Sequence, residues 1–199
     1  MIRNTITILF LLATSMLLWQ CKKSKEEIER ETVVMDSLVL MYSSLNDSIN
    51  VSWHRMTNDD DEKLFFLRRL LLEISYTNNY DKTKHSKLLE RVDSLATIRY
   101  DQQTMSDSDL IDYYDSLSSA VAYEVITFAR EHPEFEKYGL MQELINDISE
   151  KSGNVLIYRI HYDNYARERN QFIEANKKLL ETSMPDSAFA PMPLFALPG

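Results

Sequence analysis

The stretch over residues 141–180, MQELINDISEKSGNVLIYRIHYDNYARERNQFIEANKKLL, carries the most regular pattern in this chain of 199 residues. Its members recur in alternating steps of three and four residues over about five heptads, which predicts a helix with coiled-coil-like packing. The row consists of Met141, Leu144, Ile148, Lys151, Val155, Tyr158, Tyr162, Tyr165, Arg169, Phe172, Asn176 and Leu179. Gly153 lies within this row, and we expect it to permit close approach of a neighbouring helix or to form a kink.

Three segments upstream carry the same helical spacing. We expect one helix over roughly residues 24–57, a second, uninterrupted helix over 62–103 and a third over 106–131, with the sequence NDDD at 58–61 separating the first two. Glycine occurs three times and proline five times, and four of the prolines follow residue 184. A chain that keeps both helix breakers out of its interior is most easily built from long helices.

Helices joined by such short loops must run antiparallel, because a short connection cannot return the chain to the far end of the bundle. The sequence therefore predicts an all-α fold: an antiparallel up-down four-helix bundle with long coiled-coil-like helices, preceded by a signal or anchor helix. We place the bundle at residues 21–183 and an apolar, proline-rich C-terminal tail at 184–199. The sequence leaves open whether this tail packs on the bundle, lies on a membrane or stays loose.

The N-terminus has the features of an export signal. One positive side chain, Arg3, precedes an apolar run over residues 6–19 that ends near Cys21, the only cysteine of the chain. This arrangement is typical of a signal peptide. The tetrapeptide LWQC at residues 18–21 resembles a bacterial lipobox, in which the signal is removed and the cysteine becomes acylated. We expect residues 1–20 to be a lipoprotein signal peptide and Cys21 to carry the lipid; the alternative is an uncleaved membrane anchor.

Charge and composition exclude several kinds of function. The formal net charge is -9, so nucleic-acid phosphates would be repelled and no nucleic-acid partner is expected. None of the four histidines has a glutamate three residues before it, as di-iron bundles require, and a single cysteine provides no zinc-thiolate site. Three glycines leave no phosphate-binding loop. We therefore expect no enzymatic activity, no metal and no cofactor.

One candidate ligand site lies in the middle of the expected second helix. Its apolar seam falls there on three polar residues, Asn78, Asp81 and His85. Asp81 and His85 are four residues apart, so on a helix their side chains can pair. The alternative is that the chain is locally unwound here, as the polar residues 77–79 permit.

A second candidate is the tyrosine stripe of the last helix, formed by Tyr158, Tyr162 and Tyr165. These rings either line a groove that binds a ligand or serve as ordinary core residues, since tyrosine is common in both settings. The spacing alone does not separate the two interpretations.

Several short motifs resemble the signature motifs of a known family. The sequence HPEF at 132–135 is similar to a Tyr-Pro-x-Leu turn, and RIHYD at 159–163 is similar to an Arg-x-x-Tyr-Asn signature. Both signatures are typical of the LemA family of bacterial membrane-anchored helical proteins. The stretch 166–170 resembles the second Tyr-Asn motif, and Trp53 resembles the tryptophan of the family's first long helix. The resemblance implies a helical bundle held at a membrane, in a family without an established enzymatic activity.

These features together predict a membrane-tethered, LemA-like lipoprotein of the bacterial cell envelope. It would face the periplasm or the exterior, at the outer membrane rather than the inner one. Its expected role is structural, scaffolding or protein interaction, with envelope proteins or further copies of itself as partners. The alternative is a small-ligand or peptide-binding bundle that uses the face of Tyr158, Tyr162 and Tyr165.

Overall fold

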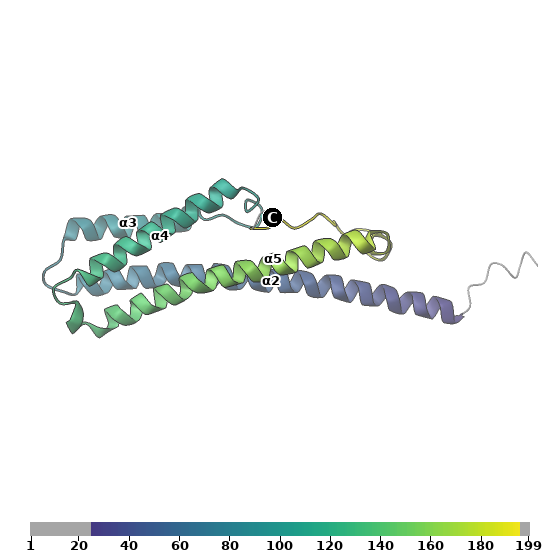
Figure 1. Cartoon of the computed structure of the whole chain (residues 1–199), viewed down its shortest axis with the longest axis horizontal. Coiled ribbons are helices and arrows are strands. Elements are labelled where there is room, and N and C mark those ends of the chain that lie inside the picture. Colours follow the sequence, from purple (N-terminus) through teal and green to yellow (C-terminus); the bar gives the residue numbers. More distant parts are fainter. Residues whose placement is uncertain (1–24, 196–199) are drawn as a thin grey trace, which may run out of the picture. The chain divides into compact units, whose positions relative to one another are not determined.

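The structure is a computed structural model that describes residues 25–195. These residues form four α-helices and one short 3-10 turn, without a strand (Figure 1). The elements are α2 (Lys25–Ser75), α3 (Lys82–Ile98), α4 (Ser108–Arg130), η1 (Phe135–Lys137) and α5 (Gly139–Ser183). The all-α prediction is confirmed for this part of the chain, whereas the expected signal peptide (1–20) and Cys21 lie outside the described residues.

The helix boundaries in the N-terminal half differ from the prediction. α2 continues through Asn58 and the three aspartates at 59–61, and the single helix expected over 62–103 is divided between the end of α2 and α3. The acidic residues do not cap a helix because two of them are used in the interior: Asp59 and Asp60 are only 6% and 4% exposed. Both carboxylates accept hydrogen bonds from other side chains, which satisfies them inside a continuous helix.

Aspartates do cap the next two helices. The Asp81 carboxylate accepts hydrogen bonds from the backbone N–H groups of Thr83 and Lys84, both at 2.9 Å. Asp107 does the same for the first turn of α4, at 3.1 and 3.2 Å. These bonds satisfy backbone donors that a helix start leaves unpaired and fix where α3 and α4 begin.

The described residues belong to two compact units. Unit 1 contains residues 25–41 and Asn176–Ser187, and unit 2 contains Tyr42–Ala175 and residues 188–195. In unit 1 the side chain of Leu180 is fully buried and the Ser183 hydroxyl lies 3.3 Å from the Met35 sulfur. No helix within residues 25–195 is both long and apolar enough to cross a membrane.

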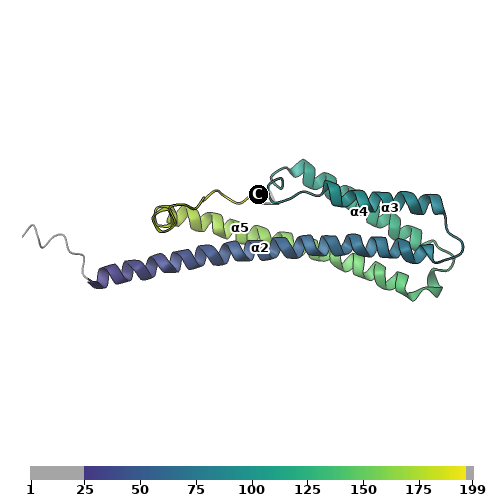
Figure 2. The ribbon, with the colours of Figure 1, turned by 180° about the vertical axis from the view of Figure 1, so that it is seen from behind.

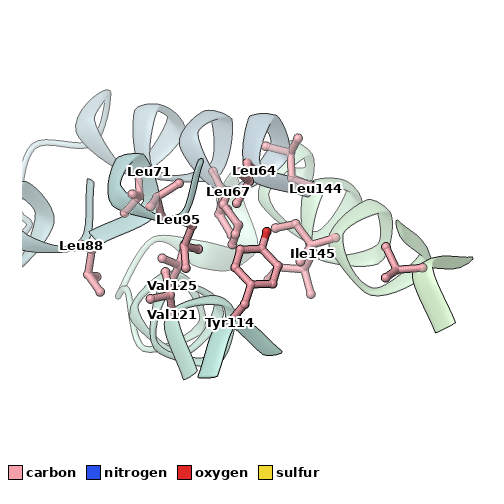
Figure 3. Packing of buried hydrophobic residues seen from close by; sticks show 14 of the residues in the cluster. Leu64, Leu67, Leu71, Leu88, Leu95, Tyr114, Val121, Val125, Leu144 and Ile145 are labelled. Atoms are coloured by element: carbon pink, nitrogen blue, oxygen red, sulfur yellow. The ribbon is translucent and has the colours of Figure 1, made fainter. Parts of the chain in front are cut away.

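Unit 2 has a continuous apolar core supplied by all four helices. Figure 3 shows side chains from these helices meeting in the interior. The core includes Leu64, Leu67, Leu71, Leu88, Val92, Leu95, Tyr114, Val121, Val125, Leu144, Ile145 and Ile148. Within unit 2, α3 and α4 lie side by side, and the α2–α3 and α4–α5 connections lie at the same end (Figure 1, Figure 2). Burial of this apolar surface is the main source of stability for the unit.

Only half of the residues in the row predicted for α5 are buried. Val155 and Tyr162 are buried as expected. Tyr165, which was expected to be buried, is 38% exposed, and its neighbour Ala166 is fully buried instead. The same shift by one residue recurs further on, with Ile173 buried instead of Phe172. At these positions two adjacent residues are both apolar, so spacing alone does not decide which of them faces the core.

Gly153 does not mark a close approach of helices, so that expectation is wrong. A Cβ atom added at this position would meet nothing within 4 Å. The residue is exposed and α5 continues through it. Its cost in helix stability is therefore not offset by any packing advantage.

Candidate functional site

The candidate site is the surface of unit 2 that holds residues 188–195, which we call the C-terminal strap. The strap has no regular secondary structure and carries a proline at two of its eight positions, 191 and 193. Proline lacks a backbone donor and restricts the chain to extended conformations, so the strap cannot satisfy its own backbone by forming a helix. Side chains of α5 supply these contacts instead. The strap and the unit 2 residues that contact it are called the strap site below.

Asn170 binds the strap backbone at two points. Its side-chain amide nitrogen donates to the carbonyl of Met192 at 2.9 Å, and its amide oxygen accepts from the N–H of the same residue at 2.8 Å. The pair of bonds satisfies both backbone polar groups of Met192 and fixes the orientation of the Asn170 amide. The contact involves backbone groups alone and is therefore independent of the side chain at position 192.

Two further α5 side chains extend this backbone recognition. Arg169 donates to the carbonyl of Ala190 at 3.0 Å, and Asp163 accepts from the N–H of Phe195 at 2.8 Å. Both side chains are buried, with residue exposures of 4% and 5%. The strap backbone is thus held at three of its residues by side chains of one helix.

Arg169 is fixed in place by α2. Its guanidinium donates to the Asn46 side chain at 2.7 Å and to the Tyr42 hydroxyl at 3.2 Å, and it lies 5.3 Å from the centre of the Tyr42 ring. The Tyr42 ring also packs edge-on against Phe189 of the strap, at 5.5 Å between centroids. A guanidinium with this many partners loses little freedom when it binds a peptide carbonyl, so the site is preorganised.

The strap ends in an aromatic cage around the ring of Phe195. This ring is stacked on Trp53, with centroids 6.2 Å apart and an interplanar angle of 12°. Tyr100 and Tyr162 meet it edge-on, at 5.8 and 5.4 Å. The Arg159 guanidinium lies 5.1 Å from its centre. Stacked and edge-on aromatic pairs each add to the free energy of apolar burial, so the Phe195 ring stabilises the docked end of the strap.

Arg159 carries a fixed positive charge beside this cage. It binds both oxygens of Asp115, at 2.5 and 2.7 Å, and donates to the Tyr100 hydroxyl at 2.5 Å. Burial alone would lower the pKa of Arg159. The hydrogen bonds to Asp115 and the neighbouring Tyr100 outweigh this effect, so the pKa lies above its ordinary value. Burial raises the pKa of Tyr100 to about 12 despite this cation, so its hydroxyl stays protonated.

A network of buried charges lies next to the cage and connects the helices of unit 2. Asp60 accepts from Lys63 at 2.5 Å, from the Tyr114 hydroxyl, and from Arg99 at 3.3 Å. Burial alone would raise the pKa of the Asp60 carboxyl, but the Lys63 ammonium and these hydrogen bonds hold it below its ordinary value. Because each charge has a partner, the network fixes the positions of α2 and α4 in the interior of unit 2.

The polar residues predicted to form a site in the expected second helix are not gathered in one pocket. Asn78 is exposed in the connection between α2 and α3, and Asp81 caps α3. The His85 ring instead lies 2.9 Å from the carbonyl oxygen of Leu71 near the end of α2, and packs edge-on against Tyr80. The chain leaves helical geometry over residues 76–81, as the second interpretation of this stretch expected.

The tyrosine stripe is divided between different environments. Tyr162 is fully buried in the aromatic cage, Tyr158 is half-buried with its ring against His161, and Tyr165 is exposed. Only Tyr162 belongs to the strap site.

Sequence reasoning missed the three α5 side chains that hold the strap. One signal was present in the sequence: Arg169 occupies an apolar position of the predicted row. A buried guanidinium requires partners, and here one of them is the peptide carbonyl of Ala190.

Comparison with known proteins gave no match. No family model matches the chain, no curated protein is similar to it, and no solved structure matches its fold. The resemblance to the LemA family stays a prediction.

Proposed function

We propose that this chain is a membrane-tethered, LemA-like lipoprotein of the bacterial cell envelope that works by contact with other polypeptides and has no enzymatic activity. The partners would be envelope proteins or further copies of the chain. The proposal combines the lipobox-like sequence at Cys21 with the strap site of unit 2.

The observation that carries the proposal is the way the strap is bound. Three α5 side chains bind backbone groups of an extended segment, and a preformed cage accepts one aromatic ring. Main-chain hydrogen bonds together with pockets for selected side chains are a general means of peptide recognition. Since the backbone contacts do not depend on the strap's own sequence, an extended segment of another chain with an aromatic residue at the matching position fits the same contacts.

Exposed apolar residues in unit 1 give further support for a role in protein contact. Ile28, Val33, Val34 and Leu40 of α2 are all more than half exposed, at 54%, 63%, 52% and 70%. α2 begins at Lys25, shortly after the predicted lipid attachment at Cys21. Large apolar side chains exposed in this number are typical of interaction surfaces.

The predicted order and direction of the helices are also part of this proposal. We propose that the four helices form an up-down antiparallel bundle that follows a cleaved signal helix. The short connections of residues 76–81, 99–107 and 131–138 support this order, because none of them is long enough to run back along a helix.

A peptide exchange experiment tests the contact function. The probe is a fluorescently labelled peptide with the sequence of residues 188–199, added to the full chain and to a Phe195→Ala variant. We expect the variant to bind the peptide in a saturable manner and at least tenfold more tightly than the wild type, because its own strap no longer fills the aromatic cage. Binding would be read as fluorescence anisotropy.

Two controls make the result specific. A second peptide with alanine in place of Phe195 should not bind, and a chain with Tyr123→Ala should behave like the wild type, since the Tyr123 ring is 72% exposed and lies outside the strap site. If the Phe195→Ala chain is folded and still does not bind the peptide, the contact function at this site is wrong. Equal binding of both peptides would also contradict it.

A further inference from the structure

Apart from the strap site, unit 2 contains a pocket of about 200 Å³ between α2, α4 and α5. Its lining residues are Lys63, Asp115, Ser118, Ser119, Ala122, Ser152, Val155, Leu156 and Arg159. On α4 these residues are spaced by three and four positions from 115 to 122, and on α5 from 152 to 159, so the pocket lies between two facing helical stripes. Both stripes carry serine or alanine where a larger apolar residue would fill the space.

Hydrogen-bond donors with unused capacity face this pocket. The Lys63 side chain is 9% exposed, and its ammonium lies 5.9 Å from the centre of the Tyr114 ring. Of its three N–H donors, one makes a hydrogen bond within residues 25–195, to Asp60. Ser118 is 4% exposed, and its hydroxyl makes no hydrogen bond to any other residue within 25–195. Both donors can therefore bind an acceptor in the pocket. Among the lining residues, Arg159 has a fully buried N–H group, at Nε, without a hydrogen-bond partner within residues 25–195, and leaving such a group unpaired costs free energy.

The apolar part of the lining is small. Ala122, Val155 and Leu156 provide its hydrocarbon surface, beside Asp115, Arg159 and two further serines. The volume is below the range of about 300 to 1,000 Å3 that is usual for sites of drug-sized ligands. A ligand that fits is therefore a small molecule with one polar end and a short hydrocarbon end.

The charges around the pocket favour an anion over a cation. The one lining carboxylate, Asp115, has both oxygens occupied by the Arg159 guanidinium. Lys63 and Arg159 both line the pocket, so their positive charges would repel a cationic ligand bound there. Asp60, the partner of Lys63, is shared with Arg99 at 3.3 Å and with the Tyr114 hydroxyl, so its negative charge is already compensated when Lys63 also binds a ligand.

We propose that this pocket binds a small organic acid. The ligand's carboxylate accepts hydrogen bonds from the Lys63 ammonium and the Ser118 hydroxyl, and its short hydrocarbon chain packs against Ala122 and Val155. The inference does not depend on the contact function of the strap. Arg159 borders both sites, but the two donors proposed to bind the carboxylate, Lys63 and Ser118, do not contact the strap.

The test compares three ligands of nearly the same shape on the full chain. Butanoate, butanamide and butylammonium would each be titrated and followed by calorimetry and by the shift in melting temperature, which rises when a ligand binds only the folded state. We expect saturable binding of butanoate, at least tenfold weaker binding of butanamide, and no binding of butylammonium. Absence of saturable butanoate binding overturns the proposal. Equal affinity for the acid and the amide overturns it too, since the pocket would then select shape alone.

A matched pair of alanine substitutions places the binding in this pocket. Ala122→Leu fills the cavity without changing a charge, whereas Ala120→Leu adds the same side chain on the exposed face of α4. We expect Ala122→Leu to weaken butanoate binding at least tenfold and Ala120→Leu to leave it unchanged. If Ala122→Leu binds butanoate as tightly as the wild type, the acid binds elsewhere and the assignment is wrong.

The charge requirement has its own pair of variants. Lys63→Met removes the buried ammonium, and Lys87→Met removes an exposed one from α3. Loss of butanoate affinity in the first and not in the second is the expected result. If Lys63→Met fails to fold, Ser118→Ala replaces it, with an expected weakening of several-fold and no effect on the charge network.

Discussion

Individual side chains in unit 2 combine burial with charge or a polar hydroxyl. The Tyr162 ring is fully buried in the aromatic cage, yet its hydroxyl has no hydrogen-bond partner within residues 25–195. Tyr100 is in the same cage, but its oxygen accepts a hydrogen bond from Arg159. The two tyrosines therefore contribute differently: Tyr100 binds the guanidinium of the Arg159–Asp115 ion pair, whereas Tyr162 contributes mainly through its ring.

Tyr162→Phe tests this difference. The substitution keeps the ring and removes an unpaired hydroxyl, so we expect the free energy of unfolding at neutral pH to stay the same or to increase by up to about 1 kcal/mol. Chemical denaturation measures the change. Tyr123→Phe is the control, because its hydroxyl is exposed and should have no effect. A loss of more than about 1 kcal/mol in Tyr162→Phe would mean that the hydroxyl has a partner in solution.

The buried tyrosines also predict how stability depends on alkaline pH. Burial raises the pKa of Tyr100 and of Tyr162 to about 12, and in Tyr162 the Asp163 charge adds to the effect. An unfolded tyrosine ionises near pH 10. Because the folded state disfavours the phenolate, this contribution to stability is complete below about pH 10 and is lost as pH rises towards 12. Thermal melts over this range should show a steep fall that is smaller in Tyr162→Phe than in Tyr123→Phe.

At the scale of the helices, sequence spacing predicted where α4 and α5 lie but not where α2 ends. Residues 58–61 have the composition of a helix cap, and nothing local distinguishes a capping aspartate from one that pairs with a lysine of another helix. Asp59 is such a case, since its partners Lys151 and Asn154 are on α5. The error arose because tertiary ion pairs overrode the local signal.

The position of the strap could not be predicted from its own composition either. An apolar, proline-rich segment fits a docked, a membrane-bound and a loose state equally well, and the sequence analysis left all three open. The structure places residues 188–195 on unit 2 because α5 side chains satisfy the backbone that proline prevents from folding on itself. Contacts between residues far apart in sequence decide where the strap lies, and the spacing of residues within one helix does not predict such contacts.

Gly153 gives a prediction for a single helix. It lies in the middle of α5, is exposed, and has open space where the Cβ atom of a larger residue would lie. Gly153→Ala should therefore increase the free energy of unfolding by about 1 kcal/mol, because glycine is a poor helix former. Denaturant titration measures it.

Gly139 is the matched control for this prediction. It also has open space around it but is the first residue of α5, where helix propensity has little influence, so Gly139→Ala should change stability much less. Destabilisation by Gly153→Ala would indicate that another chain approaches this face of α5 in solution.

At the scale of the whole molecule, the acidic net charge, the predicted lipid and the polypeptide contacts fit one role. The net charge of -9 disfavours binding to nucleic acid and to anionic lipid, so in the proposed role membrane attachment would depend on the predicted acyl chains. The proposed contact surfaces are the exposed apolar residues of α2 in unit 1 and the strap site in unit 2.

Cys21→Ser tests the attachment. We expect the variant to be released from membranes or to remain as an uncleaved precursor, because serine cannot carry the thioether-linked lipid. Membrane fractionation and the intact mass of the protein measure the outcome, and density-gradient separation of the two membranes tests the expected outer-membrane location. Ser24→Ala, three residues away, is the control and should behave as the wild type. Unchanged fractionation together with unchanged mass in Cys21→Ser would rule out lipidation.

The stacking of Trp53 against Phe195 has a practical consequence. The chain has two tryptophans, and the other one, Trp19, lies in the segment predicted to be removed on export. The mature protein would then contain a single indole, in direct contact with the ring at the end of the strap. Its intrinsic fluorescence would then be a label-free optical reporter, because any departure of the Phe195 ring from the indole would change the emission wavelength and intensity without an engineered dye.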